Sequence, residues 1–300
     1  DTDIFVVNDK TPNLMFHNAG DGTFVEHGLQ SAVAYNADGN EEASMGVAAG
    51  DYDGDGKIDL YVTHFFRESN TLYRNVGTGA FEDITREVGL EQPTMSNLGW
   101  GTQFLDFDSD GDLDLFVANG HVYPQIDLKK LGTSYPQTNQ LLRNDGDAGW
   151  FDVSSEAGPG LRIERVSRGA AFGDYDNDGD IDVFVVNLDQ AATLLRNDTP
   201  GGNRLVVELR GTGANPHAIG AWIRVHSAGK VQLRYISAAS SYLSANDIRA
   251  CFGLDRAQQV DRVEIMWPDG SRKELTRIAA NQRLVVNQEG HISTQGLGLP

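Results

Sequence analysis

Cysteine is almost absent from this chain of 300 residues, which contains Cys251 and no other. A single cysteine excludes an internal disulfide, a zinc pair of the Cys-x-x-Cys type and a Cys-x-x-Cys-His haem site. Basic residues are scarce as well, because 24 lysines and arginines stand against 43 aspartates and glutamates, for a net charge of −19. This excess of negative charge argues against nucleic acid and anionic membranes as partners.

Long apolar runs and common catalytic motifs are also missing. No apolar run comes near the length of about 18 residues that a membrane span needs. The sequence contains no Gly-x-Ser-x-Gly, no His-Glu-x-x-His, no phosphate-binding loop and no dinucleotide fingerprint. Ser240, Ser241 and Ser244 fit a serine-rich hairpin turn better than a nucleophile, since nothing nearby marks a general base. We therefore expect no catalytic residues.

Aspartate recurs in three loops with one pattern, at residues 51–59 (DYDGDGKID), 106–114 (DFDSDGDLD) and 174–182 (DYDNDGDID). Carboxylates at positions 1, 3, 5 and 9 offer hard oxygen ligands, position 7 can offer its backbone carbonyl, and glycine at position 6 permits the inward turn. The pattern predicts three Ca²⁺ sites. The predicted ligands are Asp51, Asp53, Asp55, Lys57 and Asp59; Asp106, Asp108, Asp110, Asp112 and Asp114; and Asp174, Asp176, Asp178, Asp180 and Asp182.

The main alternative is an EF-hand, which needs a bidentate glutamate at position 12 and a helix on each side. Position 12 is instead Val62, Val117 or Val185. The apolar runs that follow the loops are rich in β-branched and aromatic residues, which favours strands. We therefore predict loop-to-strand sites, although any single copy would also fit a solvated Asp-Gly turn.

Internal repetition organises the first 200 residues. The last aspartate of the loop recurs at Asp3, Asp59, Asp114 and Asp182, a period of 55 or 56 residues that is stretched once to 68. A second signature, Leu-x-x-Asn or Leu-x-x-x-Asn, ends at Asn18, Asn75, Asn144 and Asn197. Several short strands per unit at a fixed period predict β-propeller blades. The expected fold is all-β.

The pattern Gly-Asp-Tyr-Asp-x-Asp-Gly-Asp-x-Asp resembles the FG-GAP (VCBS-type) repeat of integrin-α-like propellers, which implies Ca²⁺ in loops at the propeller's edge. Residues 1–7 match positions 7 to 13 of the same unit, so Asp1 and Asp3 belong to a truncated fourth site. About three and a half blades are present, whereas a closed propeller has four to eight. We expect either a longer protein, which we favour, or a second chain that completes the ring.

After residue 200 the acidic loops stop. Alternating segments at 205–209, 221–225, 231–235, 263–267 and 283–286 predict the half-buried antiparallel strands of a small β-sandwich. We place this domain at 201–288, after a repeat region at 1–200, and expect a flexible tail at 289–300. Residues 215–221, 240–244, 252–254 and 263–270 resemble the ASPIC/UnbV domain. The combination is similar to the cartilage acidic protein family, although Cys251 stands where that family usually has histidine.

The extra residues of the long unit fall at 120–138. Insertions of this size lie on loops, and loops carry recognition. Tyr123, Tyr135 and Lys129-Lys130 make this insertion the best candidate for a contact with a protein or glycan, while a flap packed over its own blade is the alternative. His121 is expected to be structural.

We therefore expect a non-catalytic, calcium-stabilised scaffold or adhesion protein that is secreted, periplasmic or on the cell surface, where weak calcium sites of about 10⁻⁴ to 10⁻³ M are filled. Self-assembly is compatible with this interpretation. The alternative, which the same resemblance implies, is an accessory or catalytic subunit of a secreted biosynthetic or redox enzyme system.

Overall fold

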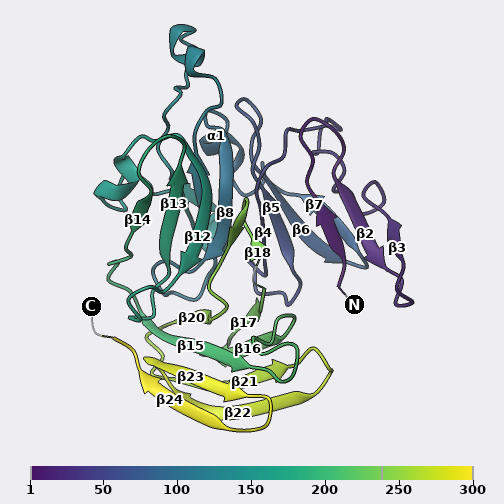
Figure 1. Ribbon diagram of the computed structural model, residues 1–300, viewed down its shortest axis with the longest axis vertical. Helices are drawn as coiled ribbons and strands as arrows, with labels where there is room; N and C mark the ends of the chain where they lie inside the picture. The colour runs from purple at the N-terminus through teal and green to yellow at the C-terminus, as the bar shows by residue number, and fades with distance from the viewer. Residues whose placement is uncertain (1, 238, 299–300) are drawn as a thin grey trace.

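The computed structural model describes residues 2–237 and 239–298, so Asp1 lies outside the described residues. Nearly all of the regular secondary structure is β-strand, mostly in antiparallel sheets, which confirms the predicted fold class (Figure 1). The helical segments are short: α1 (Glu91–Thr94) and the 3-10 turns η1 (Pro124–Leu128), η2 (Gly146–Ala148) and η3 (Pro159–Arg162). Across the described ranges, no helix is long and apolar enough to cross a membrane.

Four antiparallel meanders follow the sequence repeat, and we call them blades one to four. Blade one contains β1 (Ile4–Val6), β2 (Leu14–Asn18) and β3 (Phe24–Glu26). Blade two contains β4 (Val47–Gly50), β5 (Asp59–Val62), β6 (Thr71–Gly77) and β7 (Ala80–Asp83). Blade three contains β8 (Gly99–Leu105), β9 (Asp114–Asn119), β10 (Gln140–Asn144) and β11 (Trp150–Asp152). Blade four contains β12 (Ser167–Gly173), β13 (Asp182–Asn187) and β14 (Thr193–Leu195).

The blades stand side by side, and the described residues do not close a ring (Figure 1). Apolar residues on facing strands fill the space between neighbouring blades. Tyr61 and Leu72 of blade two pack with Phe104 and Leu115 of blade three, and each of these side chains is at most 6% exposed. Blades three and four share a second core of the same kind. Burial of these large side chains supplies the main driving force for stacking the blades.

Each acidic loop joins the first strand of a blade to the second, and position 9 is the first residue of that second strand. The second strands are β5, β9 and β13. The predicted loop-to-strand arrangement is therefore confirmed, and the EF-hand is excluded because strands flank the loops on both sides.

The asparagine signature has a structural role that its spacing alone does not reveal. The backbone N–H groups of Asn75, Asn144 and Asn197 donate to the Oδ1 of the position-9 aspartate of the same blade, at 2.8, 2.9 and 2.8 Å. Asn18 makes the same bond to Asp3 in blade one, at 2.9 Å. The Asn144 side chain also donates to the carbonyls of Leu113 and Tyr52, so it links the loops of blades two and three.

The C-terminal part forms two four-stranded sheets that pack around one apolar core below the blades (Figure 1). The first sheet contains β20 (Ala250–Asp255), β15 (Asn203–Arg210), β23 (Gln282–Asn287) and β24 (Ile292–Gly296). The second contains β17 (Lys230–Tyr235), β16 (Trp222–Ser227), β21 (Gln259–Met266) and β22 (Arg272–Ala279). All five predicted segments coincide with strands of this sandwich, except that Ala221 and Trp267 lie one residue outside β16 and β21.

Two expectations about this region differ from the structure. The strands are not all antiparallel, because β15 pairs with β23 in parallel. Residues 289–300 are not simply a flexible tail, because Ile292–Gly296 pairs with β23 as the edge strand β24. All five residues of β24 are exposed. The strand therefore has no alternating apolar pattern, and its order comes from backbone pairing that a sequence cannot display.

A short hairpin of the sandwich, β18 (Ala239–Ser240) and β19 (Ser244–Ala245), reaches up between the blades (Figure 1). Ser241 pairs with Val47 of β4, and its Oγ accepts from the Thr102 N–H of β8 at 3.0 Å. Asn246 accepts from the Phe172 N–H of β12 at 3.1 Å. The serine-rich turn therefore joins the first strands of blades two, three and four.

We predict that Asn144→Ala destabilises the chain by about 1–3 kcal/mol, because it leaves two backbone carbonyls without their amide donor. Urea denaturation measures this free energy of unfolding. The matched control is Asn18→Ala, at the equivalent but less buried position of blade one, where the side chain makes one exposed hydrogen bond, which should cost well under about 1 kcal/mol. Equal losses in the two variants would contradict the linking role.

Candidate metal centres

Each acidic loop brings three carboxylates together. In every copy, oxygens from positions 1, 3 and 9 lie within 4.8 Å of one another. The groups are Asp51, Asp53 and Asp59; Asp106, Asp108 and Asp114; and Asp174, Asp176 and Asp182. Side chains up to eight residues apart in the chain thus converge on one point, which is the geometry that a small hard cation requires.

Two left-handed residues in each loop create this convergence. Position 6 is Gly56, Gly111 or Gly179, with φ of 85°, 94° and 94°. Position 4 is also left-handed, at Gly54, Ser109 and Asn177, with φ of 71°, 60° and 64°. The sequence indicated only the first of these turns. Glycine, asparagine and serine tolerate or support such a conformation, whereas a substitution of Asn177 by alanine would add strain.

Backbone N–H groups hold the outer oxygens of the cluster. The N–H at position 6 donates to the Oδ2 of position 1, at 3.1, 3.0 and 3.2 Å in the three loops. The N–H at position 2 donates to the Oδ2 of position 9, at 3.2, 3.1 and 3.1 Å. These bonds orient the carboxylates and leave the Oδ1 of each position-1 aspartate for another partner.

The inner oxygens fit a cation. Among the described residues, five buried carboxylate oxygens have no hydrogen-bond partner: Oδ1 of Asp51, Asp106, Asp108, Asp174 and Asp176. Buried polar atoms are rarely left in this condition, because an unpaired acceptor costs about 1–3 kcal/mol. All five belong to positions 1 and 3. A cation of oxygen-ligand chemistry, such as Ca²⁺, would satisfy them together.

Positions 5 and 7 lie outside the three carboxylate groups. The position-5 carboxylates Asp55, Asp110 and Asp178 each accept the backbone N–H of position 7, at 2.9, 2.8 and 3.0 Å. The position-7 side chains point to other partners, since Lys57 pairs with Asp55, Asp112 with Lys230 and Asp180 with Arg204. Ligation of Ca²⁺ by the carboxylates of position 5 and the backbone carbonyls of position 7 stays a prediction.

Asp3 differs from its counterparts in the complete loops. Its side chain is 44% exposed, and one oxygen lies 3.5 Å from the Nδ1 of His17 while the other accepts from Asn18. Asp1 is not among the described residues. The truncated fourth site therefore stays a prediction.

Burial and mutual repulsion both act against ionisation of the clustered carboxyls. Burial raises the pKa of Asp59 and Asp106 to about 7 and that of Asp51 to about 6, and the neighbouring aspartates contribute in the same direction. Burial also raises the pKa of Asp114 well above its ordinary value. Without a cation, each loop thus holds charge that the fold disfavours.

The sandwich places its own polar groups against the acidic loops. The Gly253 N–H donates to the Oδ2 of Asp106 at 3.0 Å, and Lys230 Nζ lies 2.8 Å from Asp112. Arg249 donates to the Oδ1 of Asn177 at 2.8 Å, and Arg204 pairs with Asp180. The second and third acidic loops therefore lie at the contact between blades and sandwich.

Cys251 lies in β20, close to this contact. Its thiol is free, and burial raises its pKa well above the ordinary range, with the charges of Asp174 and Asp247 adding to the effect. A thiol that stays protonated is a poor nucleophile. The buried thiol of Cys251 is therefore expected to be inert.

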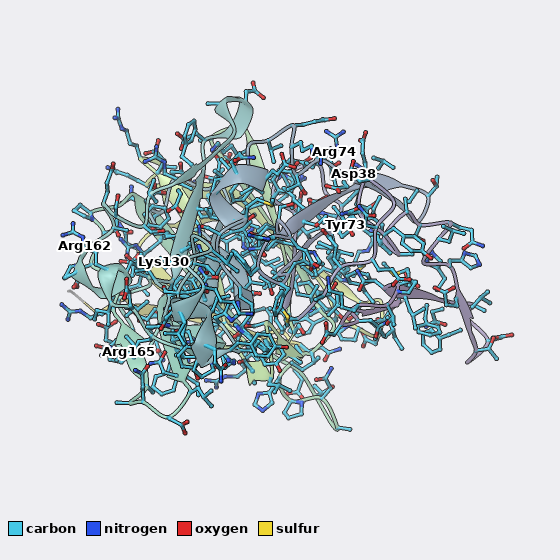
Figure 2. The ribbon with its side chains drawn as sticks, turned by 90° about the horizontal axis from the view of Figure 1, so that it is seen from above. Asp38, Tyr73, Arg74, Lys130, Arg162 and Arg165 are labelled. Carbon is cyan, nitrogen blue, oxygen red and sulfur yellow. The ribbon has the colours of Figure 1, made fainter. Side chains whose placement is uncertain are left out.

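The insertion at 120–138 rises from the end of blade three that is farthest from the sandwich (Figure 1). Its base is fixed by paired backbone hydrogen bonds between Gln137 and Arg165, at 2.8 and 2.9 Å, and Figure 2 shows Lys130 and Arg165 at the same side of the molecule. Tyr123 is 59% and Leu128 is 84% exposed. The insertion thus presents apolar side chains to solvent.

His121, at the start of the insertion, is buried against the rings of Phe65, Phe66 and Tyr123. Its Nδ1 accepts the Tyr123 N–H at 3.0 Å, and burial lowers its pKa. These contacts fit the expected structural role.

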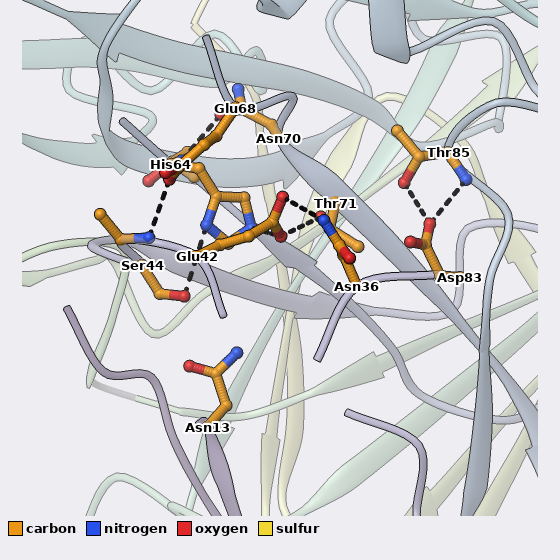
Figure 3. Close-up of polar contacts among 12 residues, drawn as sticks. Asn13, Asn36, Glu42, Ser44, His64, Glu68, Asn70, Thr71, Asp83 and Thr85 are labelled. Carbon is orange, nitrogen blue, oxygen red and sulfur yellow. Dashed lines mark hydrogen bonds and ion pairs between the residues drawn. The ribbon is translucent and has the colours of Figure 1, made fainter. Parts of the chain in front are cut away.

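A second polar cluster, which the sequence did not indicate, joins Ser44, His64 and Glu42 (Figure 3). Ser44 Oγ lies 3.4 Å from His64 Nδ1, and His64 Nε2 lies 3.2 Å from Glu42 Oε2. Although the order matches a hydrolytic triad, the serine is 5% exposed and the histidine 0%. Burial lowers the His64 pKa to about 3 and raises that of Glu42 to about 7, so both groups favour the neutral form.

Comparison with known proteins agrees with the sequence motifs. A model of the FG-GAP-like repeat matches residues 1–62 and 51–117, and a model of the ASPIC and UnbV domain matches residues 211–293. The chain is therefore an FG-GAP-like repeat protein that carries an ASPIC and UnbV domain. Cartilage acidic protein 1 has the same combination of domains and is a homologue of this chain.

Cartilage acidic protein 1 of Homo sapiens is 28% identical over 279 residues, which cover 90% of this chain and 39% of the relative. The Mus musculus protein is 28% identical over 94% of this chain and 42% of the relative. The chain thus spans about two fifths of the length of these relatives. A solved structure of an Agrocybe aegerita lectin is 13% identical to this chain and has a TM-score of 0.31. The match covers 91% of this chain and 80% of the lectin chain, and a likeness this weak supports no argument.

We predict opposite pH dependence with and without calcium. In chelator, stability should fall as pH rises from about 4 through 7, because the folded state binds protons at Asp59 and Asp106 more tightly than the unfolded state does. In excess calcium this fall should disappear or reverse, since the cation requires ionised ligands. Thermal melts between pH 5.5 and 8 measure both. A midpoint that rises with pH in chelator would contradict the carboxylate assignment.

Proposed function

We propose that this chain is a non-catalytic, calcium-stabilised scaffold of the extracellular adhesion type, with one structural Ca²⁺ in each complete acidic loop. The observation that carries the proposal is the set of five buried, unpartnered carboxylate oxygens at positions 1 and 3. Positions 1, 3 and 9 would hold the ion, with position 5 and the position-7 carbonyl completing the shell. The ion would supply positive charge where burial and repulsion disfavour the ionised carboxylates.

The ion's role follows from where the loops lie. Each loop joins two strands of a blade, and the second and third loops also contact the sandwich through Asp106, Asp112 and Asp180. Calcium bound there adds its binding free energy to folding and to the contact between the two parts. Sites of the weak extracellular kind would be filled outside the cytosol, which supports a secreted, periplasmic or cell-surface location.

The alternative of an enzyme subunit receives little support from the side chains. The Ser44, His64 and Glu42 cluster has the composition of a catalytic triad, but its serine is buried where no substrate has access. Within residues 2–237 and 239–298, the other groups of clustered carboxylates are those of the acidic loops. We therefore assign the buried cluster to the stability of blade two.

The calcium assignment predicts different effects of two isosteric changes in one loop. Asp108→Asn should remove most of the calcium-induced rise in the thermal midpoint, because it replaces a carboxylate whose inner oxygen is unpartnered. The matched control is Asp112→Asn, whose side chain pairs with Lys230 instead, and it should keep the calcium response. Melts in calcium and in chelator measure the difference. Equal responses of the two variants would overturn the ligand assignment.

The partner contact is proposed at the exposed tip of the insertion. Leu128→Asp should weaken retention on cell-deposited extracellular matrix about fivefold, the effect of losing about 1 kcal/mol at an interface anchor. The control is Val76→Asp in blade two, where the valine is 50% exposed but lies outside the insertion. Both variants should melt like the parent chain. Equal retention of the two variants would contradict a contact at the insertion.

A further inference from the structure

Blade four lacks a strand that blades two and three possess. In blades two and three, a fourth strand, β7 or β11, pairs with the third. In blade four the chain leaves β14 for the sandwich, so within the described residues β14 has β13 as its one neighbour. An unpaired strand edge is a template for the addition of another strand.

Comparison with blades two and three shows which backbone groups of blade four are available for pairing at this edge. In blades two and three the N–H of Leu72 and of Leu141 donates to a hydroxyl two residues after the fourth strand, that of Thr85 or Ser154, at 2.9 Å in each case. Their carbonyls accept the N–H of Ile84 and Val153, at 3.0 Å in each blade.

Leu194 is the equivalent residue of blade four. It is paired with Phe184, just as Leu72 is paired with Tyr61 and Leu141 with Phe116. Because opposite residues alternate in their hydrogen bonding, the same register turns the backbone polar groups of Leu194 away from β13.

Side-chain exposure changes in the same place. Leu72 and Leu141 are 0% and 6% exposed, whereas Leu194 is 48% exposed. Tyr61 and Phe116 are 0% and 2% exposed, whereas Phe184 is 47% exposed. The pairs are chemically alike and hold the same register. Blades three and four cover the faces that carry Leu72 and Leu141, whereas no following blade among the described residues covers the face that carries Phe184 and Leu194. The outer face of β14 is therefore open, as its edge is.

A cavity lies beside this edge, between blades three and four. Its volume is about 620 Å³, and apolar side chains dominate its lining. They include Phe107, Val153, Leu161, Ile181, Leu194 and Leu195. A space of this size is large enough for a small ligand or several side chains.

The matching space between blades two and three is filled by Trp150. This residue begins the fourth strand opposite Asn144, is 5% exposed, and lies 5.9 Å from the ring of Tyr52 between centroids. Its N–H donates to the Val88 carbonyl at 3.0 Å. Between blades three and four, the repeat places Phe107 at the position of Tyr52 and Ala157 at that of Val88, and both line the cavity.

We propose that the edge of β14 and this cavity bind an extended strand of another polypeptide with the pattern aromatic, any residue, acidic, apolar, Ser/Thr. In blades two and three the fourth strand and the two residues after it, Phe81-Glu82-Asp83-Ile84-Thr85 and Trp150-Phe151-Asp152-Val153-Ser154, both follow this pattern. The aromatic side chain enters the cavity opposite Asn197. The apolar residue donates its N–H to the Leu194 carbonyl, and the hydroxyl accepts the Leu194 N–H. Backbone pairing supplies affinity and the cavity supplies specificity.

The test is fluorescence anisotropy with a labelled peptide Gly-Trp-Phe-Asp-Val-Ser-Ser-Glu, the sequence of residues 149–156, added to the whole chain. We expect saturable binding. A peptide with proline in place of the valine loses the N–H that pairs with Leu194 and should bind at least about tenfold more weakly. Absence of binding, or equal binding of the two peptides, would overturn the proposal.

Two chain variants locate the site. Leu194→Asp should weaken binding of the first peptide at least about tenfold, because it places a charge on the pairing edge. Leu188→Asp, at a residue of the same blade that is 42% exposed but outside the edge and the cavity, should bind as the parent does. Equal loss in both variants would refute the site. Since this edge is separate from the carboxylate clusters, a negative result leaves the calcium response of the melts unchanged, so the two proposals fail independently.

Discussion

Neutralising three buried groups of carboxylates is the constraint on which the rest of this structure depends. Each group sits at the start of a blade's second strand, and its position-9 aspartate receives backbone N–H groups from the loop and from the following asparagine. Asp114 is 1% exposed, so the charge cannot be relieved by water. Because these aspartates fix the connection between strands, the cation that neutralises them would also fix the blade.

The same groups connect the blades to the sandwich. Lys230, Arg204 and Arg249 approach the second and third loops from the sandwich side, and the hairpin around Ser241 reaches the first strands of three blades. Ion pairs of this kind contribute little when exposed, but those of Arg204 and Arg249 are mostly buried. The sandwich therefore acts as a common base for the four described blades.

The repeat also explains the two least regular surfaces of the molecule. Blade three carries the insertion at 120–138, whose tip exposes Leu128 while its base is paired to Arg165. Blade four lacks the fourth strand, and no following blade among the described residues covers its outer face at Phe184 and Leu194. Both surfaces arise where one unit departs from an otherwise repeated plan, and such departures are where recognition is added to a scaffold.

The sequence by itself determined the all-β fold, the blade repeat and the carboxylate loops, because these depend on local patterns: alternation, turn residues and ligand spacing. It did not reveal the contact of Lys230 and Arg204 with those loops, the clustering of Ser44 with His64, or the cavity beside β14. It also missed β24, whose residues are all exposed. The contacts and the cavity join residues far apart in the chain, and β24 is held by backbone pairing alone, so only the tertiary structure could decide them.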